Sequence, residues 1–159
     1  MLDLTKGIFL EEINFLLEWG QPTAKLVSQI DANVEKVSVG FVVNWGNNEI
    51  FDGLKVNLSS KFDDGTTFES IEYEVDGDNE SLEKYKLISN HLYHVFGEPH
   101  RKDDANFEKT LYWQIKDVSI TLSLFEIFGQ NILSLHLKIE KESSLITASK
   151  NYFKNQKNK

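Results

Sequence analysis

Apolar side chains follow two different spacings along the chain. Over residues 5–18 and 81–95 they recur every three or four positions, which predicts two amphipathic helices. Each stretch leads into a similar tetrad, W-G-Q-P at 19–22 and F-G-E-P at 96–99. Glycine is common just after a helix, and a proline two residues later prevents the helix from resuming. Both tetrads are therefore interpreted as helix ends.

Beyond each tetrad the apolar residues alternate with polar ones. This period is typical of strands with one face on a core and the other in water. Three runs follow each tetrad, and short turn signals such as 46–48 separate several of them, which favours antiparallel meanders. The six runs are 37–45, 54–58, 68–75, 111–115, 118–124 and 133–139.

The two halves suggest a repeated unit within one domain of residues 1–159. We predict an α+β fold built as a degenerate tandem repeat, 1–78 and 79–142, of one helix and a three-stranded antiparallel meander. The six strands would form one curved antiparallel sheet with both helices on one face. Residues 143–159 would add a short C-terminal helix and a frayed tail.

Charge divides unevenly between the two parts of the chain. Residues 1–100 hold 18 acids against 7 lysines, a net of −11, whereas residues 101–159 hold 7 acids against 10 basic residues, a net of +3. Over 62–83 there are nine carboxylates and no Lys, Arg or His. A field of that sign repels nucleic acid and anionic membrane and attracts basic partners. We expect no nucleic-acid or membrane binding.

The sequence contains no cysteine, and we expect no leader segment. With no Cys, thiolate chemistry, iron–sulfur clusters and cysteine-bound zinc are excluded. The N-terminal apolar run 8–10 ends at once in Glu11 and Glu12, so neither a secretory nor a membrane segment is expected. A cytoplasmic protein that is a monomer or a weak dimer is the expectation.

Histidine and carboxylate motifs give little support for catalysis. His91 and His94 are spaced i, i+3 on the second predicted helix, with Glu98 just beyond, but a metal site needs further ligands and supporting contacts. No nucleophile elbow and no glycine-rich phosphate loop is present. We therefore expect no enzyme activity, no metal and no cofactor.

Aromatic residues offer a candidate anchor for a partner. Trp45 and Phe51 flank the predicted turn at 46–48, close to Glu49 and Asp52. Aromatic side chains ringed by acids are typical of a binding face for a basic protein, although core packing is the commoner role of such residues.

The chain resembles the immunity proteins that bacteria keep beside secreted antibacterial toxins. The resemblance is architectural: it lies in the tetrads 19–22 and 96–99, each after a helix and before a meander, and in the acidic stretch 62–83. It implies a protein that binds a cognate toxin domain, often a cationic nuclease, and blocks it. The residues expected to contact such a basic partner are Asp63, Asp64, Glu69, Glu72, Glu74, Asp76 and Asp78, with Trp45 and Phe51 as anchors.

Two alternatives stay open at this point. One is a small enzyme or ligand binder with a pocket between sheet and helices that uses His91, His94 and Glu98. The other is an adaptor subunit that self-associates through an exposed strand.

Overall fold

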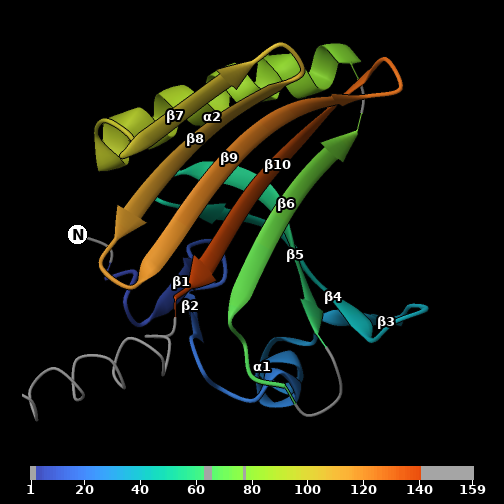
Figure 1. Cartoon of the computed structure of the whole chain (residues 1–159). Helices are drawn as coiled ribbons and strands as arrows, with labels where there is room; N and C mark the ends of the chain where they lie inside the picture. The colour runs from blue at the N-terminus through green and yellow to red at the C-terminus, as the bar shows by residue number, and fades with distance from the viewer. Residues whose placement is uncertain (1–2, 63–65, 77, 141–159) are drawn as a thin grey trace, which may run out of the picture.

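Residues 3–62, 66–76 and 78–140 are described by the computed structural model, which is an α+β structure (Figure 1). Eight strands form one antiparallel sheet in the order β3-β4-β5-β6-β10-β9-β8-β7, and β1 and β2 form a separate hairpin. The first four strands of the sheet are β3 (Asn33–Lys36), β4 (Phe41–Ile50), β5 (Leu54–Phe62) and β6 (Ser70–Asp76). The other four are β7 (Arg101–Ala105), β8 (Glu108–Ile115), β9 (Val118–Ile127) and β10 (Gln130–Ile139).

All six predicted strand runs lie in or overlap strands of this sheet, and the alternation identified the side that faces the core. In β10, Leu133, Leu135 and Leu137 are fully buried, whereas the polar residues between them are partly exposed. The hydrophobic effect selects this register, because a slip of one residue would turn every leucine outward. The short edge strands β3 and β7 were missed, because their residues are all exposed and carry no alternation to recognise.

The predicted helix over 5–18 is wrong. These residues form the antiparallel hairpin of β1 (Gly7–Leu10) and β2 (Phe15–Glu18), in which Ile8, Leu10 and Leu17 are buried. Gly7 is needed here, because a Cβ at this position would lie 2.1 Å from the Leu17 carbonyl oxygen. Residues 5–18 include so many apolar side chains that they fit both the helical spacing and the alternation of a strand. Spacing alone could therefore not decide between helix and strand.

The first tetrad begins a helix instead of ending one. Helix α1 (Thr23–Ile30) starts directly after Pro22, whose carbonyl accepts hydrogen bonds from the Lys25 and Leu26 amides at 3.0 and 3.3 Å. Proline is as compatible with the start of a helix as with the position after its end, since its missing N–H has no helical partner in the first turn. The interpretation of Pro22 as a stop is therefore wrong.

The second tetrad does end a helix. Helix α2 (Asp78–Phe96) covers the predicted 81–95, and Gly97 follows it with φ +75°. The Gly97 amide donates to the Tyr93 carbonyl at 3.0 Å, which is the bond of a left-handed helix cap. Trp113 Nε1 donates to the Gly97 carbonyl at 2.9 Å and ties this end to β8.

A repeat of a helix and three strands is not confirmed. Each four-stranded meander follows a helix, but α1 has 8 residues and α2 has 19, and only α2 packs along the sheet, against β10, β9 and β6. Figure 1 shows α1 beyond the lower end of β6, so the two helices do not share one face. The predicted C-terminal helix and tail lie outside the described residues.

One hydrophobic cluster joins the hairpin, both meanders and α2. It draws Ile8 from β1, Leu58 from β5, Leu92 from α2 and Leu135 from β10 into a single core. Trp19 stacks on Phe68 with ring centroids 4.8 Å apart and donates through Nε1 to the Leu4 carbonyl at 2.8 Å. Among the described residues, neither helix has the length and apolar character that a membrane span would require.

Candidate functional site

Glu72 and Glu74 of β6 lie on the side of the sheet opposite α2. Glu72 and Glu74 alternate with buried Ile71 and Tyr73, as the sequence pattern predicts. Glu72 forms an ion pair with Lys61 of β5 at 2.9 Å. Its carboxylate accepts a hydrogen bond from the Lys61 ammonium and so raises the pKa of that lysine.

The other predicted acids are scattered around β6. Glu69 precedes the strand and accepts a hydrogen bond from the Thr67 hydroxyl at 2.8 Å. Asp76 ends β6 and Asp78 begins α2. The remaining two, Asp63 and Asp64, lie outside the described residues.

Glu74 differs from its neighbours because it is exposed and forms no ion pair with any residue that the structure describes. It faces Ser134 of β10 in the sheet register. Of the predicted face, Glu74 therefore presents an exposed carboxylate without an ion-pair partner among the described residues.

The surface around these residues is a polar sheet face, which we call the open face. It is formed by β6, β10, β9 and β8, and no described helix crosses it in Figure 1. Two rows of side chains run across it, Glu72–His136–Thr121–Tyr112 and Glu74–Ser134–Ser123–Thr110. The Thr110 and Ser123 hydroxyls hydrogen-bond each other at 2.9 Å, so part of the face is held in a defined arrangement.

His136 lies at the centre of the open face. Burial lowers its pKa below the ordinary value of 6.5, and the nearby Glu72 carboxylate opposes that shift. Lys138 and Lys61 act in the same direction as burial. The imidazole is therefore held in its neutral form over a wider pH range than a free histidine.

The prediction that Trp45 and Phe51 form an exposed anchor is wrong. Their exposed fractions are 4% and 1%, and both belong to the core. Trp45 donates through Nε1 to the Ser60 hydroxyl at 2.8 Å, and Phe51 packs edge-to-face on Phe96 at 5.1 Å. Burying a large aromatic side chain in the core is more favourable than exposing it to water, provided that the indole N–H keeps a hydrogen-bond partner.

The turn that was expected at 46–48 is displaced by five residues. Strand β4 continues through a β-bulge between Asn44 and Gly46, and the chain reverses at 51–53. Phe51, Asp52 and Gly53 all have positive φ, at 56°, 63° and 101°. Gly46 also has a positive φ of 83°, a conformation that glycine adopts readily and that accompanies the bulge here.

Histidines 91 and 94 are not joined in a ligand set. The His91 Nε2 lies 2.6 Å from the Phe51 carbonyl oxygen, so this ring supports the 51–53 turn. Within residues 3–62, 66–76 and 78–140, no group of three or more histidine or carboxylate side chains is placed to hold a metal ion.

A cleft opens between β5, β6 and residues 80–91 of α2, and we call it the β5–β6 cleft. Its volume is about 670 Å³. The walls are Leu54–Asn57 and 73–75, and α2 contributes Leu87, Ile88 and His91. Lys84 of α2 also lines the cleft and connects the helix to β6. Its ammonium pairs with Glu80 at 2.5 Å and lies 5.9 Å from the Tyr73 ring centroid.

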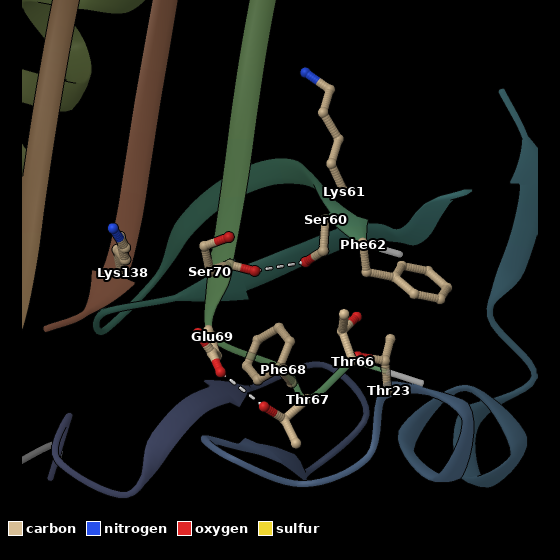
Figure 2. A pocket seen from close by; sticks show the side chains of 10 residues that line it. All are labelled: Thr23, Ser60, Lys61, Phe62, Thr66, Thr67, Phe68, Glu69, Ser70 and Lys138. Carbon is tan, nitrogen blue, oxygen red and sulfur yellow. Dashed lines mark hydrogen bonds between the residues drawn. The ribbon is translucent and has the colours of Figure 1, made fainter. Parts of the chain in front are cut away.

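A smaller hollow of about 260 Å³ lies at the other end of the same strands (Figure 2). Its lining is rich in hydroxyl groups, and Ser60 donates to the Ser70 carbonyl at 2.8 Å across it. Thr23 is 2% exposed, and its hydroxyl has no hydrogen-bond partner among the described residues. Figure 2 shows the Lys61 ammonium directed away from Thr23, so it does not complete this hollow as an anion site.

Sequence reasoning located the open face through the alternation in β6, but it missed the β5–β6 cleft. Alternation is as clean in β5 as in β10, and it does not reveal how far two strands stay paired.

Comparison of the chain with protein-family models, curated proteins and solved structures yields no significant match.

Proposed function

We propose that this chain is a non-catalytic cytoplasmic binding protein of the immunity type, which neutralises a basic toxin domain by covering it. The observation that carries the proposal is the open face, a broad sheet surface that presents carboxylates and hydroxyls. Such a face offers many hydrogen-bond donors and acceptors at fixed spacings, which suits a polar, hydrated protein interface.

Charge favours a basic partner. The chain has a net charge of −8, and Glu74 adds a carboxylate with no described counter-ion at one side of the open face. Opposite net charges accelerate encounter, and a few desolvated contacts then set the dissociation rate. Glu72 contributes less to this attraction, since Lys61 already neutralises it.

A small-molecule binder is the second candidate. The β5–β6 cleft supports it, because about 670 Å³ lies within the range of roughly 300–1,000 Å³ that is typical of ligand pockets. His91 lines this cleft, although the Phe51 carbonyl occupies its Nε2.

Charge reversal tests the proposal. The immobilised full-length chain is used to capture partners, and each captured basic protein is purified for kinetic measurement. We expect Glu74→Lys to lower the association rate about tenfold at low ionic strength and to reduce its salt dependence. Glu72→Lys is expected to have a smaller effect.

The matched control is Glu35→Lys on the exposed edge strand β3, which makes the same charge change far along the sheet from β10. If association and its salt dependence are the same for Glu74→Lys, Glu35→Lys and the unaltered chain, the open face is not the binding surface.

A further inference from the structure

The two neighbours of β6 pair with it to very different extents. With β10 it forms seven consecutive pairs, from Ser70 to Asp76. With β5 it forms one, Ser59 with Glu72. The Ser60–Ser70 hydrogen bond and the Lys61–Glu72 ion pair hold the strands together at this end. Towards Leu54 and Asp76 the two strands diverge, and the β5–β6 cleft lies there.

Main chain lines this cleft on both sides. Side chains of a strand alternate between its faces, so a cavity on one face touches every second residue. Here four consecutive residues of β5 (54–57) and three of β6 (73–75) line the same space. Their strand edges are therefore part of the wall. Within the described chain, β5 pairs along 54–57 only with β4, and β6 pairs along 73–75 only with β10.

The remaining wall of the cleft comes from α2, which contributes Leu87 and Ile88 together with the polar residues Glu80, Lys84 and His91. Ile88 of α2 is buried, but Leu87 is 62% exposed although it lines the cleft. Val56 and Tyr73 add buried apolar surface from the two strands. An exposed leucine beside unpaired strand edges is unfavourable in water, and a bound chain would cover both.

The outer edges of the sheet are protected against strand addition, which makes this interior gap distinctive. Edge strand β7 has the sequence RKDDA and is exposed throughout, and edge strand β3 has only four residues. Charged or very short edge strands discourage pairing with other chains. The edges of β5 and β6 in the cleft lie instead beside a mixed lining that includes the apolar side chains of Leu87 and Ile88.

We propose that the β5–β6 cleft binds an extended polypeptide segment, which adds as a strand between β5 and β6. Its main chain would pair with the free edges at 54–57 and 73–75, and alternate side chains would contact Leu87 and Ile88. A segment of about four residues matches the length of 54–57, since an extended strand rises roughly 3.3 Å per residue. A Lys or Arg in the segment would complement Glu74, which also lines the cleft and has no described ion-pair partner.

This inference rests on the proposed function in one respect: the segment is taken to belong to the bound partner. It can nevertheless be tested without that partner. The probe is a phage-displayed library of linear peptides of about seven residues, selected on the full-length chain. We expect the selected peptides to alternate apolar residues and to contain a basic residue.

Two leucines of α2 provide a matched pair of variants. Leu87→Glu places a charge in the cleft, whereas Leu82→Glu makes the same change on the same helix outside the cleft. We expect Leu87→Glu to weaken peptide binding about tenfold or more, with Leu82→Glu unchanged. Circular dichroism and the unfolding midpoint show that both variants are folded.

Strand addition is distinguished from side-chain docking by its main-chain bonds. Hydrogen–deuterium exchange should show new protection of amides within 54–57 and 73–75 when the peptide binds, and N-methylation of alternate peptide bonds should abolish binding. The inference is overturned if no peptide is selected, if protection appears on the open face or at β7, or if Leu87→Glu binds as well as Leu82→Glu.

The outcomes separate this inference from the proposed function. Glu74 borders both surfaces, so they are separated by Leu87→Glu in the cleft and Thr121→Lys on the open face. Weaker binding of a captured protein by Leu87→Glu, with no effect of Thr121→Lys, would contradict the open face as the binding surface and support the cleft. The reverse result would keep the open face and remove the cleft. Selection of peptides derived from this chain's own sequence would indicate self-association and contradict a foreign partner.

Discussion

Strand β6 pairs with β10 along one edge and with β5 along the other, and we call these two lines of pairing the β10 seam and the β5 seam. They show how similar sequences produce different pairing. The partner segments on the two sides, 54–62 of β5 and 130–139 of β10, both alternate apolar and polar residues. The β10 seam is a continuous ladder, whereas the β5 seam has one pair and then opens into a cleft. Alternation therefore specifies which face is buried, but it does not specify how far a ladder extends.

The largest expected effect comes from the core behind the β10 seam. Leu135 is fully buried in the centre of β10, so Leu135→Ala should lower the free energy of unfolding by about 2–5 kcal/mol. Urea denaturation measures this change. The control Val34→Ala, on the exposed edge strand β3, should cost less than about 0.5 kcal/mol. Equal losses would contradict the assignment of Leu135 to the core.

The β5 seam depends on one hydroxyl group. Ser60 accepts a hydrogen bond from Trp45 Nε1 and donates one to the Ser70 carbonyl, both at 2.8 Å. Ser60→Ala leaves a buried indole N–H unpaired and should cost about 1–3 kcal/mol. The neighbouring Ser59→Ala is the control, because no side-chain bond of Ser59 is part of the seam. Denaturation curves that superimpose for the two variants would show that the hydroxyl does not hold the strands.

The ion pair at the same seam should contribute less. Lys61 is largely exposed, so solvent screens its attraction to Glu72, and a double-mutant cycle of Lys61→Met and Glu72→Gln should give a coupling of about 0.2–1 kcal/mol. Unfolding measured at low and high salt tests this, since the coupling should shrink at high salt. A coupling that persists unchanged at high salt would mean that the pair is more buried than described.

The smallest effect is expected from pH. Burial lowers the pKa of His136, so the unfolded chain binds a proton at higher pH than the folded chain. The corresponding stability is present above pH 6.5 and is lost as the pH falls through the folded pKa. Unfolding should therefore become easier as the pH falls below about 6.5. In His136→Gln this slope should be reduced, and an unchanged slope would contradict a perturbed histidine at this position.

The contrast between the seams also explains what could be predicted. The open face follows from alternation in β6 and β10, because an antiparallel sheet with one wet side must place Glu72 and His136 outward. Helix α2 follows from its apolar spacing and from Gly97. The cleft could not be predicted, because nothing in the alternation of 54–62 marks the point where pairing with β6 stops.

The predicted anchors and the first helix failed for a related reason. Trp45 and Phe51 stand beside polar residues in the sequence, but the bulge at Gly46 and the turn at 51–53 rotate both rings into the core. At 5–18 the apolar residues are dense enough for either period. Gly7 and Asn14, with its φ of 50°, are the local signals that favoured a hairpin.

The sequence alone determined the polarity of the faces of the six alternating strands, the extent of α2 and the excess of negative charge in the first hundred residues. These are local properties, because each depends on the spacing or sum of nearby side chains. Tertiary structure decided which strands meet, where their pairing ends and which aromatic rings are covered. Those outcomes depend on contacts between segments far apart in the chain, where burial of the common core outweighs local preference.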